Sequence, residues 1–322
     1  YDERNVQKTY TYFGRLSALK YTNIRFFETQ NDDSTRLNCY VMLTKSKHKS
    51  ISFELEGTNS AGDLGAAASV SFQHRNLFRG SETFMVKFRG AYEAISGLQP
   101  GYKNHNYTEY GVETSINFPS FLFPFLTSDF KRRIRATTEF GLQYNYQLRP
   151  EFSRTIASAS WSYKWMQKQK IQHRIDLLDI SYLYLPWISP QFQEDYIDKD
   201  KDNYILRYNY ENRLIVRMGY TYNYNSAGGT LVNNTITSNS YSIRAGFESA
   251  GNILYGVSKM INMRKNKDGE YAILGIPYAQ YLKGDFDFAK NIIIDHRNSL
   301  AFHAGIGVAI PYGIRIGSYR II

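Results

Sequence analysis

The sequence predicts an all-β protein, a transmembrane antiparallel β-barrel preceded by part of a small α+β domain. The first observation is the stretch Tyr204–Asn225 (YILRYNYENRLIVRMGYTYNYN), in which apolar and polar residues alternate. Alternation with a period of two indicates a β-strand with one apolar and one polar face. Soluble strands average about five or six residues, whereas about nine to eleven cross a bilayer. We therefore predict one membrane strand whose end extends into water.

Composition is the second observation. Aromatic residues make up 16% of the chain, with 28 Tyr and 20 Phe against 3 Trp, although the mean hydropathy is −0.46. Membrane barrels combine aromatic girdles with polar interior residues. The chain contains no apolar run long enough for a membrane helix, which needs about twenty residues.

The charge and the cysteine content narrow the class of protein further. The net charge of +10 fits anionic lipid head groups or an arginine-lined interior better than nucleic acid, because no nucleic-acid-binding motif accompanies it. Cys39 is the only cysteine, which excludes an intrachain disulfide and a cysteine zinc site. We expect no cofactor.

The first segment, Tyr1–Ser46, differs from the rest. Apolar residues recur at helical spacing at Val6, Tyr10, Phe13, Leu16 and Leu19. Two short strands follow, at Thr22–Glu28 and Arg36–Thr44. The segment fits either a small α+β cap or the end of a periplasmic module that begins upstream. Since no leader-like sequence follows Tyr1, we expect any export signal to lie upstream or to have been removed.

From Lys49 onward nearly every segment alternates apolar and polar side chains, as successive barrel strands do. The predicted strands, roughly eleven in number, are Ile51–Leu55, Ala66–Phe72, Phe84–Tyr92, Tyr110–Phe118, Ile134–Tyr146, Thr155–Trp165, the less regular His173–Leu185, Tyr204–Asn225, Tyr241–Phe247, Tyr278–Phe288 and Leu300–Ile310.

The connections between these strands are of two kinds. Short ones include His74–Gly80 and Met166–Lys170, and the long polar ones are Ser96–Asn106, Trp187–Asn203 and Lys259–Glu270. Outer-membrane barrels have short periplasmic turns and long external loops. Strand parity therefore predicts that the first two long loops lie outside. It also makes the apolar stretch Phe118–Leu126 (FPSFLFPFL) a periplasmic turn at the membrane interface.

The ionisable residues give little sign of catalysis. The histidines are isolated from one another, without metal-ligand spacing: His48, His74, His105, His173, His296 and His303. An enzyme in which His303 meets a serine and a carboxylate across the lumen is the less favoured reading, because no nucleophile or paired-carboxylate motif supports it. We expect no catalytic residues and no bound metal.

Several charged residues are predicted to face the lumen: Arg133, Arg135, Glu139, Arg207, Arg213, Arg217 and Arg244. The arginines could select anions as a pore lining. The alternative, which we favour, is ion pairing with carboxylates such as Glu139, Glu211 and Glu248.

Longer motifs resemble a known family. FELEGTNSAGDLG, FQHRNLFRGSETF, TEYGVETSINFPSFLFPFL, RTIASASWSYKW and LAFHAGIGVAIPYG resemble the BamA/TamA outer-membrane insertase superfamily, also called the bacterial surface antigen family. Within it they are most similar to the TamA-like lipoprotein branch (TamL) of Bacteroidota. The resemblance implies that residues 1–47 are the C-terminal part of the last periplasmic POTRA domain and that residues 48–322 are the barrel.

Two features depart from the family. Its barrel has sixteen strands, more than the eleven or twelve that alternate here. Its Arg-Gly-aromatic loop tip is absent, since Phe78-Arg79-Gly80-Ser81 and Phe88-Arg89-Gly90-Ala91 lack the aromatic residue and lie in the wrong strands. We therefore expect the barrel to be incomplete in this numbering, with closure by further strands or by another chain.

The resemblance also implies a function without catalysis. The family's first barrel strand is a lateral gate to which a substrate strand adds, and here that strand would comprise Ser50, Ile51, Ser52, Phe53, Glu54 and Leu55. The implied partners are outer-membrane lipids and lipopolysaccharide, unfolded outer-membrane proteins, and periplasmic or lipoprotein accessory subunits such as a TamB-like partner. The location would be the bacterial outer membrane, with the N-terminal part in the periplasm. The alternative is a passive pore or a structural barrel.

Overall fold

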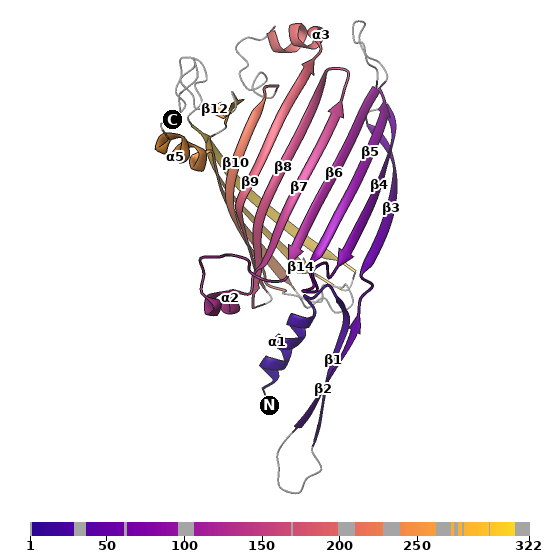
Figure 1. The fold of residues 1–322 in the computed structure, drawn as a ribbon, viewed down its shortest axis with the longest axis vertical. Helices are drawn as coiled ribbons and strands as arrows, with labels where there is room; N and C mark the ends of the chain where they lie inside the picture. The colour runs from indigo at the N-terminus through magenta and orange to yellow at the C-terminus, as the bar shows by residue number, and fades with distance from the viewer. Residues whose placement is uncertain are drawn as a thin grey trace.

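The computed structural model describes residues 2–28, 37–60, 63–95, 106–168, 170–198, 210–227, 239–261, 272–273, 276–278, 280–295 and 297–312. Its main feature is one curved antiparallel sheet, with a helix and a hairpin at one end (Figure 1). Among the described residues, no helix is both long enough and apolar enough to cross a membrane.

The sheet has eleven strands, and each pairs with its neighbours in chain order. They are β3 (Lys49–Ser60), β4 (Asp63–Arg75), β5 (Thr83–Ala94), β6 (Asn106–Phe118), β7 (Thr137–Leu148), β8 (Phe152–Gln167), β9 (Ile171–Ile188), β10 (Arg213–Asn225), β11 (Ser240–Ala250), β14 (Tyr281–Ile293) and β15 (Ser299–Pro311). This confirms the predicted antiparallel sheet.

The N-terminal segment forms the predicted helix and hairpin. Asp2 caps α1 (Glu3–Phe13) by accepting a hydrogen bond from the backbone N–H of Arg4 at 2.9 Å. β1 (Leu19–Glu28) pairs with β2 (Leu37–Lys45). The Tyr10 hydroxyl accepts from the Ile24 N–H at 2.8 Å, which attaches the helix to the hairpin.

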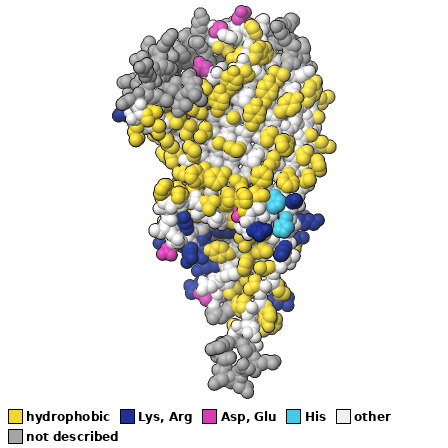
Figure 2. Space-filling model, viewed as in Figure 1, with side chains coloured by type: hydrophobic (Ala, Val, Ile, Leu, Met, Phe, Trp, Pro, Cys, Tyr) yellow, Lys and Arg dark blue, Asp and Glu magenta, His cyan; other side chains and the backbone are white. Residues whose placement is uncertain are grey.

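The two faces of the large sheet differ in chemistry. Large apolar side chains are exposed on one face, including Phe53, Phe88, Tyr110, Leu142 and Phe247. Hydrophobic atoms cover the outside of the strands in this view (Figure 2). Cross-strand ion pairs such as Lys164–Glu139 and Arg217–Asp179 lie on the other face. The alternation therefore sorts apolar side chains to the outside and charged ones to the inside of the curved sheet.

The described connections divide between the two ends of the sheet as parity predicts. The turn between β4 and β5 and the one between β8 and β9 lie at the end that carries α1, as does α2 (Ser128–Ile134) (Figure 1). The opposite end carries the remaining small elements: α3 (Pro190–Phe192), the π-helical turn η1 (Gln193–Asp198), α5 (Asn252–Met260), β12 (Ala272–Ile273) and β13 (Ile276–Pro277).

The prediction of one strand over Tyr204–Asn225 was wrong in part. β10 begins only at Arg213, and a turn and a bend occupy residues 210–211. The Tyr210 ring packs on Phe152 and Phe192, with centroids 5.5 and 5.1 Å apart. The Asn212 side chain accepts from the Leu185 N–H at 2.8 Å. These contacts replace strand pairing, and residues 204–209 lie outside the described residues.

The strand predicted to start at Ile134 starts at Thr137 instead. Arg135 ends α2 in the left-handed conformation (φ 56°), and its N–H donates to the Lys131 carbonyl. Arg133 lies within the helix. The prediction that both arginines lie on a strand was wrong. The acidic residue in the first turn of α2 and the three basic residues in its last turn interact favourably with the helix dipole, which favours a helix here.

The turn between β4 and β5 is built around a buried carboxylate. The Glu82 carboxylate accepts from the backbone N–H groups of Phe78 and Gly80, each at 3.0 Å. Three residues in the turn, Asn76, Arg79 and Ser81, have positive φ without being glycine. The Ser17 hydroxyl donates to the Ser81 carbonyl at 2.8 Å, so this turn also holds the N-terminal segment.

Replacing Glu82 tests whether the turn depends on that carboxylate. Burial raises the Glu82 pKa, but hydrogen bonds from the backbone N–H groups of Glu82 itself, Gly80 and Phe78 outweigh it and hold the pKa below its ordinary value. Glu82→Gln should lower the free energy of unfolding by about 1–2 kcal/mol at pH 7. A depressed carboxylate pKa stabilises the folded state above the unfolded pKa of about 4.3 and loses that effect as pH falls through the folded value.

Urea unfolding in detergent at pH 7 and at pH 4 measures both effects. The difference between the Glu82→Gln variant and wild type should shrink at pH 4. Glu194→Gln, at an exposed position in η1, is the matched control. Equal stability of the Glu82→Gln variant and wild type at pH 7 would contradict the role of the carboxylate.

Candidate functional site

The candidate site is the outer edge of β3, the strand that contains all of the predicted gate residues. The sheet order ends at β3 on one side and at β15 on the other. Within the described part of the chain, β3 pairs only with β4, from Lys49 opposite His74 to Ser60 opposite Asp63. Its other edge therefore presents backbone N–H and C=O groups that another strand can satisfy.

Side chains along β3 alternate as a membrane strand requires. Ile51, Phe53 and Leu55 are 62, 75 and 87% exposed on the apolar face. Ser50 and Glu54 point to the polar face, where the Ser50 hydroxyl donates to Gln73 at 3.4 Å. An incoming strand with the same alternation would therefore continue both faces of the sheet.

Two ion pairs attach β3 to β5 across β4. Glu54 Oε2 accepts from Lys87 Nζ at 3.0 Å and from Ser69 Oγ at 2.9 Å. Glu56 accepts two hydrogen bonds from Arg89, at 3.0 and 3.3 Å. We call Glu54, Glu56, Lys87 and Arg89 the β3–β5 clasp.

Small side chains on the intervening strand make room for the clasp. Ala67 and Ser69 of β4 are buried beneath it. The clasp therefore adds side-chain contacts between β3 and β5 to the backbone pairing that already joins each of them to β4.

A second charge network lies on the same face farther along the sheet. Arg217 Nη2 is 2.7 Å from Asp179 Oδ2, and Arg217 Nη1 is 3.8 Å from Glu248 Oε1. The Tyr281 hydroxyl donates to Glu248. A register shift in β9 between Asp176 and Asp179 brings both aspartates to this face. Of the two roles predicted for the arginines, the structure thus shows ion pairing for Arg217.

The other residues predicted to face the lumen have different surroundings. Glu139 pairs with Lys164 on the polar face. Arg213 starts β10 on the same face as Arg217, and Arg244 is exposed opposite Asp287. Arg133 and Arg135 belong to α2 and its C-terminus, and Arg207 lies outside the described residues.

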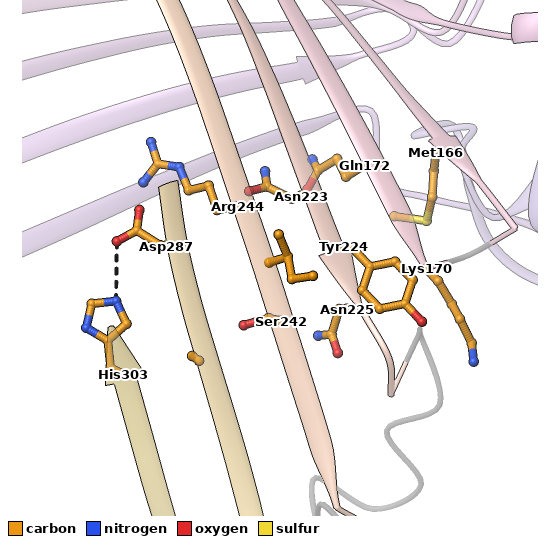
Figure 3. A pocket seen from close by; sticks show the side chains of 12 residues that line it. Met166, Lys170, Gln172, Asn223, Tyr224, Asn225, Ser242, Arg244, Asp287 and His303 are labelled. Carbon is orange, nitrogen blue, oxygen red and sulfur yellow. Dashed lines mark ion pairs between the residues drawn. The ribbon is translucent and has the colours of Figure 1, made fainter. Parts of the chain in front are cut away.

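A pocket of 570 Å³ opens on the polar face between β9 and β15 (Figure 3). Arg244, Asp287 and His303 line it together with Asn223 and Ser242. His303 Nε2 is 3.3 Å from Asp287 Oδ1, but the histidine is 67% exposed, so the pair contributes little.

The pocket does not contain a recognisable catalytic arrangement. Acyl transfer needs a nucleophile beside such a histidine, and in the described part of the chain no serine hydroxyl is hydrogen-bonded to His303. Nor do three or more potential metal ligands come together within the described ranges.

Sequence reasoning missed most of the clasp and the two aspartates. Lys87 and Arg89 lie at polar positions of β5, two strands away from the glutamates of β3. Side chains two strands apart can form an ion pair only where the strand between them carries small residues. Asp176 and Asp179 are three residues apart, so simple alternation puts them on opposite faces. Only the register shift in β9 brings the two aspartates to the same face of the sheet.

The comparison with solved structures agrees with this fold. No protein-family model matches the chain, and no curated protein matches it. Among solved structures, a match is the crystal structure of BamA from Haemophilus ducreyi lacking POTRA domains 1–3, with a TM-score of 0.50 and 12% sequence identity. The match covers 96% of this chain and 49% of that chain, so this chain spans about half the length of its solved neighbour. The chain therefore has the fold of a BamA barrel wall.

Removing one arm of the clasp should loosen β3. Arg89→Gln removes the two hydrogen bonds to Glu56, so the backbone amides of Ser52–Glu56 should exchange with deuterium roughly two- to five-fold faster. Hydrogen exchange with mass spectrometry on the protein in nanodiscs measures this.

Lys164→Gln is the matched control, because it removes an ion pair of the same polar face between β7 and β8. It should leave exchange in β3 unchanged. Unaltered exchange in the Arg89→Gln variant would show that the clasp does not hold the strand.

Proposed function

We propose that this chain is the wall of an outer-membrane assembly factor of the BamA/TamA superfamily, in its TamL-like branch. The observation that supports this most is the edge of β3, a strand whose apolar side chains are exposed and whose outer backbone groups face no other described strand. The BamA-like fold supports the same assignment.

The proposed mechanism is strand addition. A client β-strand pairs with Ser50–Leu55, so its backbone N–H and C=O groups are hydrogen-bonded before they meet hydrocarbon, where an unpaired group costs several kcal/mol. Its apolar side chains then continue the row formed by Ile51, Phe53 and Leu55. The step requires no cofactor and no catalytic residue.

The assignment also proposes location and partners. Residues 1–47 are the C-terminal part of the last POTRA domain and lie in the periplasm, and residues 48–322 belong to the barrel. α1 and the hairpin, held to the sheet through Ser17, support that arrangement. The clients are unfolded outer-membrane proteins, and the surrounding partners are membrane lipids, lipopolysaccharide and accessory subunits such as a TamB-like protein.

A cysteine at Ser52 tests strand addition directly. In a Cys39→Ser background, Ser52→Cys should form disulfides in cells with cysteines placed along a terminal strand of a nascent outer-membrane protein. Ser71→Cys is the matched control, because Ser71 is the β4 partner of Ser52 and is one strand, about 4.8 Å, farther from the edge. A crosslink at Ser52 and none at Ser71 is expected; absence of crosslinks at every position from Ser50 to Leu55 would exclude the gate.

The second candidate is a passive pore, favoured by the charges on the polar face, Arg217 and Arg244 among them. A pore gives steady conductance in planar bilayers, and its depletion leaves other outer-membrane proteins at normal levels. An assembly factor gives little steady conductance, and its depletion lowers the levels of other outer-membrane proteins.

A further inference from the structure

The connection between β6 and β7 folds back over the outer, apolar face of the sheet. The Tyr163 hydroxyl donates to the Leu122 carbonyl at 3.0 Å. Thr138 Oγ1 donates to the Ser120 carbonyl at 2.8 Å and accepts from the Leu122 N–H at 2.9 Å. Thr138 and Tyr163 are register partners on the face of Phe140, and both are buried. The connection is therefore fixed to the outside of the wall.

Apolar side chains of this connection remain exposed after that packing. The Phe121 ring contacts Tyr163, with centroids 4.7 Å apart, and Phe123 contacts Phe125 at 5.6 Å. Leu122, Phe125 and Phe130 are still exposed, Phe125 by 86%. They extend the apolar outer surface at its α1 end, which is the level where aromatic residues meet a membrane interface.

Basic side chains follow at once. Lys131, Arg132 and Arg133 form the last turn of α2, with Asp129 as the acidic residue of its first turn. Within the described residues none of the three is paired with a carboxylate. Lys and Arg side chains gather beneath the apolar band around the position of α2 and α1 (Figures 1 and 2). An exposed apolar loop beside a basic turn has the character of an interfacial membrane anchor.

The basic turn is also joined to α1. The Arg135 guanidinium lies over the Tyr12 ring at 3.8 Å. Arg15 Nη1 donates to the Arg135 carbonyl at 3.3 Å. A contact between α2 and the membrane would therefore fix the direction in which α1 leaves the sheet.

We propose that residues 118–135, the interface anchor, bind acidic phospholipid head groups: Leu122, Phe125 and Phe130 enter the leaflet, and Lys131, Arg132 and Arg133 bind the phosphates. The anchor lies at the α1 end of the sheet (Figure 1), which the proposed function assigns to the periplasmic side, where the leaflet consists of phospholipid and not of lipopolysaccharide. The proposal rests on residence in the outer membrane and is independent of strand addition at β3.

Depth measurements on a spin label test the anchor. The label is attached to Phe125→Cys in a Cys39→Ser background, in nanodiscs of phosphatidylcholine with increasing phosphatidylglycerol. The accessibility of the label to molecular oxygen, relative to its accessibility to a water-soluble nickel complex, reports how deeply the label is immersed in the membrane. The label should become immersed as phosphatidylglycerol increases. In K131Q/R132Q/R133Q, the label should stay in water at phosphatidylglycerol contents that immerse it otherwise, because each Lys or Arg near an anionic surface contributes roughly five-fold in affinity and three together about a hundred-fold.

The charge-matched control is K20Q/R25Q/K45Q, which removes three exposed basic residues from β1 and β2. Its titration should match that of the otherwise unaltered labelled protein. Three results would overturn the proposal. The label could stay in water at every composition, as for a surface that binds protein. The triple variant could titrate unchanged, or lipid A could replace phosphatidylglycerol with equal effect.

Discussion

Hydrogen bonding between neighbouring antiparallel strands is the constraint on which this structure depends. Eleven strands pair in chain order, so each interior strand has a hydrogen-bonded neighbour on both sides. In hydrocarbon an unpaired peptide group is costly. The two end strands, β3 and β15, are therefore the places where the sheet can accept another strand. The proposed function uses the first of these edges as a template.

The position of a residue on that backbone ladder restricts which side chain it can carry. The sheet has little conventional core, since buried positions in the described strands favour small residues such as Ala67 and Ser69. Small residues on β4 let Glu54 and Glu56 reach Lys87 and Arg89 two strands away. Where charges fall out of alternation, as at Asp176 and Asp179, a register shift restores them to the polar face.

Much of the fold could be predicted from the sequence, because a period of two is a local property. The antiparallel sheet, the initial helix and hairpin, and the end of the sheet at which each described connection lies were predicted. Errors arose where nonlocal contacts decide the backbone. Tyr210 and Asn212 continue the alternation but serve a ring contact and a side-chain hydrogen bond. Arg133 and Arg135 alternate equally well, yet they end a helix.

The candidate site was less accessible to sequence reasoning. The position of Ser50–Leu55 on an edge strand agrees with the prediction, whereas their role in pairing with a client stays a prediction, as do the POTRA assignment and the absence of catalysis. The clasp is formed by side chains of β3 and β5 that meet across β4. The alternation pattern within a single strand does not predict such contacts.

The strand order has a consequence for how the sheet forms. Every strand of the large sheet pairs with the sheet strands before and after it in the chain, and the entropy of closing a loop rises only slowly with its length. The turn around Glu82 joins β4 to β5 through its own backbone N–H groups, so this hairpin is stabilised by contacts that are local in the sequence. A sheet in which strands pair in chain order has two edge strands, the first and the last, and in the described sheet these are β3 and β15.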